Sequence, residues 1–499
     1  MILKINGNIN RYYVETLCMV FFPGSTFGED EEPGEGIPEV TVEVFDSDAD
    51  AVSAYVSIKL NDKTCEATET VARTEEMTIA NHESIAVGRA VFAAGKELLG
   101  HTPPWGILTG VRPAKIAGSL FTSGNGVMKT KKILRDEYFL NLHKAALAVS
   151  VAQSEMRVIR KMPNNTCSLY IAIPFCPSRC AYCSFVSYTT PRLLSMIDEY
   201  IDAMLIDLDE TLSVIKELSL EVTTVYIGGG TPTTLSPEQL ERIFLKLREY
   251  IDVESLAEFT MEAGRPDTIT KEKLDMAKKH GVTRISVNPQ TLNDSILKEI
   301  GRRHTTEDFY RAFEIAKESG IRDINVDLIA GLPGDDFKSF SVTVDKIIEL
   351  APSNLTVHTF CVKKASDALR NNSGVYSLTG GDAAKCVSYS QLKAKLAGYK
   401  PYYMYRQKNT VGNLENVGFC QEGREGLYNV YMMEEVQSIF AVGAGAVTKL
   451  VKFNGAFAPG TRIERIFRPK YPYEYLKKDD LSARLQKARE EIFAFFNEE

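Results

Sequence analysis

The middle of the chain alternates short apolar runs with longer segments in which apolar residues recur every three or four positions. The runs predict strands at Cys167–Ile173, Thr224–Ile227, Phe259–Glu262, Arg284–Val287, Ile324–Ile329 and Leu355–Thr359. The segments between them predict amphipathic helices at Leu193–Leu218, Pro237–Tyr250, Lys271–His280, Thr306–Ser319 and Phe337–Leu350. Such alternation favours parallel βαβ units. No obvious Rossmann glycine fingerprint accompanies it, so we expect an α/β fold, an open, partial (β/α)6 barrel over residues 166–360.

The flanking segments predict two further domains. Residues 1–165 combine alternating runs with helical spacing, which predicts an α+β domain that ends at Pro163-Asn164-Asn165 and to which we assign no chemistry. Its expected strands and helices are Val40–Phe45, Ala54–Leu60, Ser84–Leu99 and Lys131–Met162. Residues 361–499 predict a C-terminal α/β domain that ends in the helix Ser482–Phe496. We expect this domain to cover the substrate.

One stretch of the C-terminal domain interleaves aromatic and cationic residues, from Pro401 to Lys408. Such a stretch could stack on a flat macrocycle and pair with its carboxylates. A surface strand with cations that reach into solvent explains the pattern equally well.

Three cysteines follow the first barrel strand with C-x3-C-x2-C spacing: Cys176, Cys180 and Cys183. Three thiolates on one short loop can converge on a soft metal centre, such as zinc, copper(I) or an iron–sulfur cluster. Zinc normally takes a fourth protein ligand, and the next cysteine is Cys361. Buried or disulfide-bonded thiols are the alternative, but such thiols rarely crowd one loop.

Glycine and polar residues follow the other predicted strands, where a barrel carries its chemistry. Gly228-Gly229-Gly230-Thr231-Pro232-Thr233 follows the second strand, and the third ends at Glu262. Gln290 follows the fourth, and the fifth carries Asp327 before a Gly-Leu-Pro-Gly turn. Each feature alone is more often a turn, a helix cap or a solvated group. Agreement at four strand ends favours one site.

Composition and charge narrow the class of protein. The chain has 499 residues, 44% of them apolar and 25% charged, as expected for a globular protein of two or three domains. The net charge of −8 argues against non-specific nucleic-acid binding. No apolar run reaches about 18 residues, and the first residues do not resemble a signal peptide. Nine scattered cysteines fit a reducing compartment, so we expect a cytoplasmic protein.

The cysteine loop, with Tyr182 just before its third cysteine, resembles the radical S-adenosylmethionine (SAM) superfamily. Taken with the strand-end residues, in order over residues 167–360, it resembles more closely the oxygen-independent coproporphyrinogen III oxidase (dehydrogenase) family. The long N-terminal extension is similar to that of the longer, Bacillus- and Clostridia-type branch called HemZ.

The resemblance implies two cofactors, a 4Fe–4S cluster and SAM. Cys176, Cys180 and Cys183 would hold the cluster and leave one iron open for SAM. The glycine turn, through Gly229, Gly230 and Thr231, would meet the amino-acid end of SAM. Arg302, a dozen residues after Gln290, would pair with the SAM carboxylate, which suits a guanidinium fork.

The resemblance also implies residues around the rest of SAM. Glu262, Gln290 and Asp327 would bind the ribose or adjacent polar groups. Tyr170 would line the same SAM, and Tyr182 would lie beside a second SAM where the family has one. Val447, in a Gly-Ala-Gly-Ala-Val segment, would close over the adenine.

The implied activity is the oxygen-independent oxidative decarboxylation of two coproporphyrinogen III propionates to vinyl groups, which gives protoporphyrinogen IX in haem synthesis. A tetrapyrrole substrate, an electron donor such as flavodoxin or ferredoxin, and a monomer are expected. Phe185 departs from the family, because a further cysteine usually stands there, and Arg302-Arg303-His304-Thr305 looks more like the related haem chaperones. The chaperones' His-Asn pair followed by Tyr-Trp has no clear counterpart. Two alternatives therefore stay open: a haem-binding chaperone, and a radical SAM enzyme that methylates or opens another tetrapyrrole.

Overall fold

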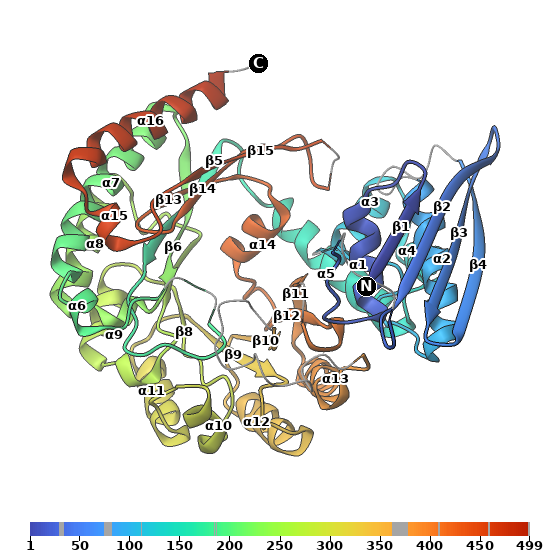
Figure 1. Cartoon of the computed structure of the whole chain (residues 1–499). Helices are drawn as coiled ribbons and strands as arrows, with labels where there is room; N and C mark the ends of the chain where they lie inside the picture. Colours follow the sequence, from blue (N-terminus) through green and yellow to red (C-terminus); the bar gives the residue numbers. More distant parts are fainter. Residues whose placement is uncertain are drawn as a thin grey trace. The chain divides into compact units, whose positions relative to one another are not determined.

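The computed structural model describes residues 1–28, 34–73, 82–110, 112–183, 185, 187–361, 378–407, 410–457 and 460–497 (Figure 1). Its backbone contacts divide the chain into two compact units. The first unit comprises the described parts of Met1–Gln153, Asn371–Lys385 and Met404–Asn416. The second unit comprises the described parts of Ser154–Arg370, Cys386–Tyr403 and Val417–Glu499.

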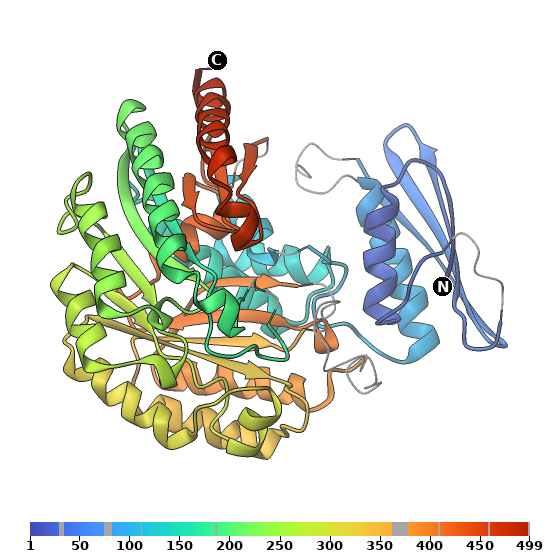
Figure 2. The same ribbon diagram turned by 60° about the vertical axis from the view of Figure 1, so that its left-hand side comes forward.

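A four-stranded sheet with two helices on one face begins the first unit (Figure 2). The elements are β1 (Ile2–Asn6), α1 (Arg11–Phe21), β2 (Glu39–Asp48), β3 (Ala51–Leu60), β4 (Lys63–Ala72) and α2 (His82–Leu99). The strands lie in sequence order, β1 parallel to β2 and the rest antiparallel. Alternate side chains of β2 and β3, such as Val42 and Val56, are fully buried, as the period of two predicts.

Two helices follow in the same unit, α3 (Pro113–Thr122) and α4 (Val127–Asp136), and a third, α5 (Leu142–Ile159), begins in the first unit and ends in the second. The prediction of one helical segment over Lys131–Met162 was wrong. Phe139 has a φ of 61°, which a continuous right-handed helix does not accommodate. Asn141 then accepts a 2.8 Å hydrogen bond from the backbone N of Lys144 at the start of α5.

The second unit contains the open, partial (β/α)6 barrel that the sequence predicts. Its six parallel strands are β5 (Thr166–Ile173), β6 (Glu221–Gly229), β7 (Glu258–Glu262), β8 (Arg284–Ser286), β9 (Asp323–Ala330) and β10 (Asn354–Thr359). Helices α7 (Ile197–Glu217), α8 (Pro237–Arg248), α9 (Lys271–Lys279), α11 (Thr306–Glu318) and α12 (Phe337–Glu349) lie along the outside of the curved sheet (Figure 1). Short helices α6 (Pro191–Leu194) and α10 (Asp294–Glu299) complete this part.

The later strands extend the barrel sheet at both edges, in the order β11-β12-β10-β9-β8-β7-β6-β5-β13-β14-β15. These strands are β11 (Lys400–Arg406), β12 (Glu415–Cys420), β13 (Ser438–Val442), β14 (Val447–Lys452) and β15 (Arg462–Phe467). β13 runs parallel to β5, and all five of its residues are buried. The helices are α13 (Gly381–Leu396), α14 (Leu427–Glu434), α15 (Pro472–Tyr475) and α16 (Lys478–Asn497).

The domain bounds 1–165, 166–360 and 361–499 stay a prediction, because the sheet of the barrel continues into the residues after 361. The aromatic and cationic stretch from Pro401 is not a surface strand. Tyr402, Tyr403 and Arg406 are all buried in β11, and Lys408 lies outside the described residues. Within the described residues, no helix is long and apolar enough to cross a membrane.

Candidate functional site

The cysteine loop leaves the carboxyl end of β5 and is tied back to the barrel by backbone hydrogen bonds. Cys176 N donates to Tyr188 O over 3.1 Å, and Tyr188 N donates to Pro174 O over 2.8 Å. Phe175 is fully buried beneath the loop, with its ring 5.1 Å from the ring of Tyr200. These contacts fix the first cysteine at the end of the first barrel strand.

The far side of the loop is held by the segment that follows β8. Ala181 N donates to Ile300 O over 3.0 Å, and Ser178 Oγ donates to Gly301 O over 2.9 Å. Gly301 has a φ of 78°, and a Cβ there would lie 2.8 Å from the carbonyl oxygen of Arg179. The loop and this segment therefore pack backbone to backbone, which glycine permits.

Cys176 and Cys180 are buried, and Cys183 is partly buried. Burial raises the pKa of Cys176 to about 11, although a contact of 3.3 Å between its Sγ and Thr231 Oγ1 opposes the rise. Cys183 N donates to Cys180 O over 3.1 Å, so the loop turns between its second and third cysteines. Thiolates in such surroundings need nearby positive charge, which iron supplies.

The glycine turn after β6 packs directly against the cysteine loop. Gly230 N donates to Ile173 O over 2.7 Å, and Thr231 N donates to Phe175 O over 2.8 Å. A Cβ on Gly230 would lie 2.7 Å from Phe175 O, and Gly229 has a φ of 108°. The triplet is glycine because the turn has no room for side chains and needs a positive φ.

Glu262, at the end of β7, faces the glycine turn and accepts a 2.6 Å hydrogen bond from Tyr226 Oη. The pKa of Glu262 is raised to about 7, mainly by burial and in part by the negative charge of Asp327. The hydrogen bonds from Tyr226 and from the backbone of Gly229 oppose this rise. The carboxyl group is therefore part protonated at neutral pH. The ring of Tyr226 lies 4.5 Å from that of Tyr428 and 6.0 Å from that of Tyr170.

Asp327, on β9, is held in a net of side-chain hydrogen bonds. Its Oδ2 accepts from Asn288 Nδ2 over 2.8 Å, and its Oδ1 accepts from Asn325 Nδ2 over 2.7 Å. His358 Nε2 lies 3.8 Å from Oδ2. Burial raises the pKa of Asp327, but His358, Asn325 and other donors outweigh it and hold the pKa below its usual value. Asp327 is therefore the charged member of the two carboxyl groups.

Arg302 links the cysteine loop to these strands. Its Nη2 donates to Tyr182 Oη over 2.8 Å, and its Nη1 donates to Gly264 O over 2.7 Å and to Asn288 O over 3.4 Å. Asn288 therefore bridges Arg302 and Asp327, since its side chain bonds to Asp327. The arginine, the aspartate and the loop tyrosine form one connected group.

Gln290 joins this group through its backbone, and Val447 lies on a strand farther along the sheet. Gln290 is buried with a φ of 69°, and its backbone N donates to Asp327 O over 3.2 Å. Val447 lies on β14, where its ladder partner is Phe467, and β13 separates that strand from β5. Tyr170 packs against the buried cluster of Ala172, Ala441 and Ala446. Ala446 directly precedes Val447 in the sequence.

Four residues of this region were not predicted as site residues from the sequence: Asn288, Tyr226, Tyr428 and Arg265. His304 was noted only as part of a stretch similar to the haem chaperones. Asn288 and Tyr226 lie in or beside predicted strands, and the alternation of β6 and β8 could have pointed to them. Tyr428 comes from α14, far away in the sequence, and only the fold brings it to β6. Arg265 Nη2 donates to Ser178 Oγ of the cysteine loop over 2.9 Å. Burial lowers the pKa of His304 to about 3, and the positive charges of Arg302 and Arg265 lower it further in the same direction.

Among the residues that the structure describes, no three His, Cys, Asp or Glu side chains are arranged to hold a single metal ion. A 4Fe–4S cluster does not need such a set, because each cysteine binds a different iron. Three soft thiols on one loop, beside a backbone turn without side chains, fit a cluster of that kind.

Comparison with known proteins agrees with this geometry. The Radical SAM superfamily model matches residues 170–347. The oxygen-independent coproporphyrinogen-III oxidase-like protein HemZ of Bacillus subtilis (strain 168) is 37% identical over 380 residues, which cover 75% of each chain. The chain belongs to the oxygen-independent coproporphyrinogen-III oxidase-like family of radical SAM proteins.

Among other proteins similar to this chain, one is named a haem chaperone and another a coproporphyrinogen III oxidase. The haem chaperone HemW of B. subtilis is 36% identical over 197 residues, 39% of this chain and 51% of the chaperone. The solved structure of coproporphyrinogen III oxidase (HemN) from Escherichia coli shares the fold, with a TM-score of 0.50 and 21% identity over 66% of this chain and 72% of that chain. Like its superfamily, this family member binds a 4Fe–4S cluster and SAM.

Proposed function

We propose that the protein catalyses the oxygen-independent oxidative decarboxylation of two propionate side chains of coproporphyrinogen III, which gives the vinyl groups of protoporphyrinogen IX in haem synthesis. Membership of the family supports a radical SAM reaction on a tetrapyrrole. The observation that carries most weight is the bridge that Asn288 makes between Arg302 and Asp327, beside Tyr182 of the cysteine loop. Hydrogen bonds fix the positions of the side chains in this group, which is what positioning of a reactive cofactor requires.

In this proposal Cys176, Cys180 and Cys183 hold the cluster. Gly229, Gly230 and Thr231 meet the amino-acid end of SAM, because their backbone is open to close approach. The guanidinium of Arg302 takes the SAM carboxylate in exchange for the hydroxyl of Tyr182, which it now contacts over 2.8 Å.

The remaining roles follow from position along the strands. Glu262, Gln290 and Asp327 bind the ribose and nearby polar groups, with Asp327 as an acceptor and Glu262 as an acceptor or donor near neutral pH. Tyr170 lines the same SAM, Tyr182 lies where a second SAM sits in those family members that have one, and Val447 lies near the adenine.

When bound, the cluster and SAM supply a carbon radical that removes a hydrogen atom from the substrate. Each propionate then releases carbon dioxide and passes one electron to a one-electron acceptor, and a vinyl group remains. The protein's residues hold the propionate, exclude water and keep the reacting carbon near the cysteine loop. A low-potential donor, such as flavodoxin or ferredoxin, reduces the cluster in a cytoplasmic monomer.

The test is anaerobic incubation of the reconstituted protein with coproporphyrinogen III, SAM and a reductant, with chromatography of the porphyrins. We expect vinyl products, two molecules of carbon dioxide per porphyrinogen, and consumption of SAM in proportion. The Cys176→Ser variant is the matched control and forms no product. SAM cleavage without vinyl porphyrin in the unaltered protein would contradict the proposal.

A second candidate is a haem chaperone, which the side chain of Phe185 favours. This ring stands two residues after Cys183 and is 65% exposed, so an apolar side chain faces solvent beside the cysteine loop. Such a ring can stack on a flat macrocycle. Stoichiometric haem binding that Phe185→Ala weakens, together with no vinyl product, would favour the chaperone over the dehydrogenase.

A further inference from the structure

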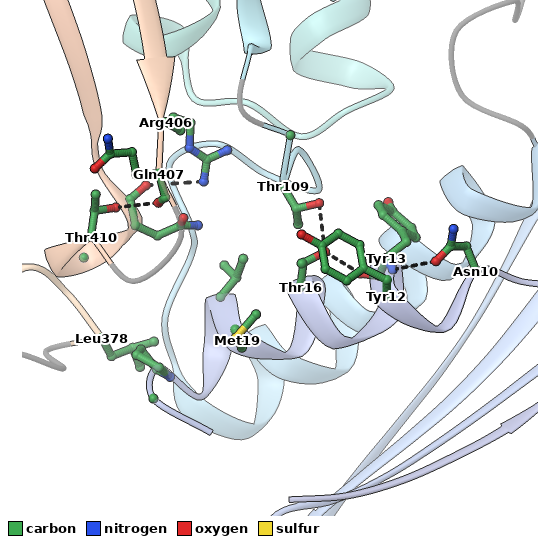
Figure 3. Close-up of a pocket in the computed structure, with 16 residues that line it drawn as sticks. Asn10, Tyr12, Tyr13, Thr16, Met19, Thr109, Leu378, Arg406, Gln407 and Thr410 are labelled. Atoms are coloured by element: carbon green, nitrogen blue, oxygen red, sulfur yellow. Dashed lines mark hydrogen bonds between the residues drawn. The ribbon is translucent and has the colours of Figure 1, made fainter. Parts of the chain in front are cut away.

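The first unit contains a cavity of about 210 Å³ that the barrel chemistry does not use (Figure 3). Helix α1 forms one wall, the loop around Thr109 and Gly110 forms another, and the end of β11 with residues 410–413 forms a third. In Figure 3 the side chains of Arg406 and Thr410 lie toward one side, and those of Asn10, Tyr12 and Tyr13 lie toward the other. All of these residues belong to the same compact unit.

Arg406, which lines this cavity, is 2% exposed, so its guanidinium is almost fully withdrawn from bulk solvent. Its Nη1 donates to Leu108 O, and its Nη2 donates to Asn413 O over 3.3 Å. Within the described parts of the chain, its Nε has no acceptor. A buried guanidinium with an unused donor costs free energy unless an acceptor reaches it.

The charges around Arg406 do not balance. Glu415 is fully buried and forms an ion pair with Lys144, while its Oε2 accepts from Trp105 Nε1 over 2.8 Å. Arg406 lies over the ring of Trp105, 5.4 Å from its centroid, and forms no direct ion pair with Glu415 among the described residues. Within the described part of the chain, two buried cations thus lie near one carboxylate, and that carboxylate pairs with Lys144 and not with Arg406.

The protonation of Arg406 does not remove this excess. Burial lowers the pKa of Arg406 to about 10, and Glu415 raises it. The guanidinium therefore remains charged at neutral pH, so the unit carries a buried positive charge beside a cavity.

The rest of the lining suits an apolar group rather than a second charge. Met19, Val20, Pro23 and Leu378 contribute apolar surface, and Thr109 and Gln407 add uncharged polar groups. Pockets for drug-sized ligands typically enclose about 300–1,000 Å³, so this cavity takes a smaller molecule or one arm of a larger one. A single excess charge matches a monoanion better than a phosphate dianion.

We propose that this cavity binds a small monocarboxylate with an apolar body, whose carboxylate pairs with the guanidinium of Arg406. The apolar body packs against Met19, Val20 and Leu378. The carboxylate comes from a free organic acid or from a propionate arm of a larger molecule. None of the lining residues comes from the cysteine loop, and the proposal does not depend on the tetrapyrrole reaction.

The test is isothermal titration calorimetry of the full chain with 3-phenylpropionate, its neutral analogue 3-phenylpropionamide, and inorganic phosphate. We expect one saturable site for the carboxylate, binding of the amide weaker by at least about thirtyfold, and no phosphate site. Equal binding of the amide, tighter binding of phosphate, or no saturable carboxylate binding at millimolar concentration would overturn the proposal.

Two variants locate the site and one controls for charge. Arg406→Gln removes the guanidinium, and Thr109→Phe fills the cavity with a ring. Thr109 lies in a partly exposed loop, so the Thr109→Phe protein tests the site even if the Arg406→Gln protein does not fold. Both should abolish carboxylate binding. Arg11→Gln removes the same charge from helix α1 at an exposed position outside the lining, and should leave binding unchanged. Unchanged binding in Thr109→Phe and in a folded Arg406→Gln protein would refute the site.

Competition identifies the source of the carboxylate. Coproporphyrin III, which carries four propionates, should displace 3-phenylpropionate if the cavity accepts an arm of a tetrapyrrole. If it does not displace the probe while the probe still binds through Arg406, the natural ligand is a free organic acid. Loss of tetrapyrrole turnover would leave these binding results intact, so the two proposals fail separately.

Discussion

The hydroxyl of Tyr226 donates a 2.6 Å hydrogen bond to Oε1 of Glu262, and the two side chains come from neighbouring strands of the barrel. A Cβ on Gly228 would lie 2.7 Å from the Tyr226 ring and 3.1 Å from the Glu262 carboxylate, so glycine leaves the room for this pair. The bond favours the charged form of Glu262, while burial favours the neutral form by more. The balance places the carboxyl group near its midpoint at neutral pH.

The first prediction concerns Glu262→Gln and the pH dependence of stability without ligands. The pKa of Glu262 is about 7 in the folded protein, above its usual value of 4.5. Between these values the unfolded chain releases the proton and the folded chain keeps it, so stability falls as pH rises from 4.5 to 7 and then levels off. The loss is at most about 3 kcal/mol, and Glu262→Gln should lack it. Urea unfolding at pH 5 and pH 8 measures the difference.

A second variant separates this effect from other titrating groups. Tyr226→Phe removes the bond that lowers the pKa of Glu262, so the pH at which the stability loss levels off should move above 7. If the unaltered protein and Glu262→Gln had parallel pH profiles, the raised pKa of Glu262 would be refuted.

The second prediction concerns the cluster. Anaerobic reconstitution should give about four irons per chain, because three soft thiolates on one loop suit a 4Fe–4S cluster. Serine at Cys176, Cys180 or Cys183 should abolish the visible absorbance and the bound iron. Serine at Cys167, which is fully buried in β5, is the matched control and should keep both. A full cluster spectrum in Cys176→Ser would exclude the three-ligand assignment.

The third prediction is that Arg302→Ala weakens SAM binding by about 2–5 kcal/mol, because the SAM carboxylate loses its partner. Calorimetry with SAM on the reconstituted protein measures this loss. Arg303→Ala is the control, since Arg303 is exposed and adjacent. Arg302 also donates to Gly264 O, so the melting temperature of each variant must be measured alongside. SAM affinity that does not change in a folded Arg302→Ala protein would remove Arg302 from the site.

The fourth prediction is that Gly230→Ala damages both folding and cluster binding. The added Cβ would lie 2.7 Å from Phe175 O and 2.8 Å from Ile173 O, and neither backbone atom can move easily. We expect a loss of about 1–3 kcal/mol in the free energy of unfolding and a lower iron content. Gly126→Ala, where a Cβ meets nothing within 4 Å, should change neither. Normal stability with a full cluster in Gly230→Ala would show that the turn is looser than the structure indicates.

The fold of the barrel followed from the sequence because its strands are short apolar runs separated by amphipathic helices, and this pattern is local. The predicted strand at Cys167–Ile173 corresponds to β5 at Thr166–Ile173, and the predicted strand at Leu355–Thr359 to β10 at Asn354–Thr359. The cysteine loop and the glycine turn were equally visible, since each is one continuous stretch of chain. Local spacing failed at Lys131–Met162, where helical periodicity continues through a turn that a positive φ at Phe139 creates.

Only the tertiary structure decided which residues meet from distant segments. β13 follows β5 by more than 260 residues and pairs with it in parallel. All residues of β13 are buried, and a fully apolar strand does not reveal from its sequence which strands it will pair with. The stack of Tyr428 on Tyr226 arises in the same way. Arg406 is the clearest case, because a cationic stretch predicts solvent or a macrocycle, yet the fold buries its guanidinium against Trp105 and beside a cavity. Sequence specifies which groups exist and their local geometry, whereas burial and charge balance depend on all the chain that folds around them.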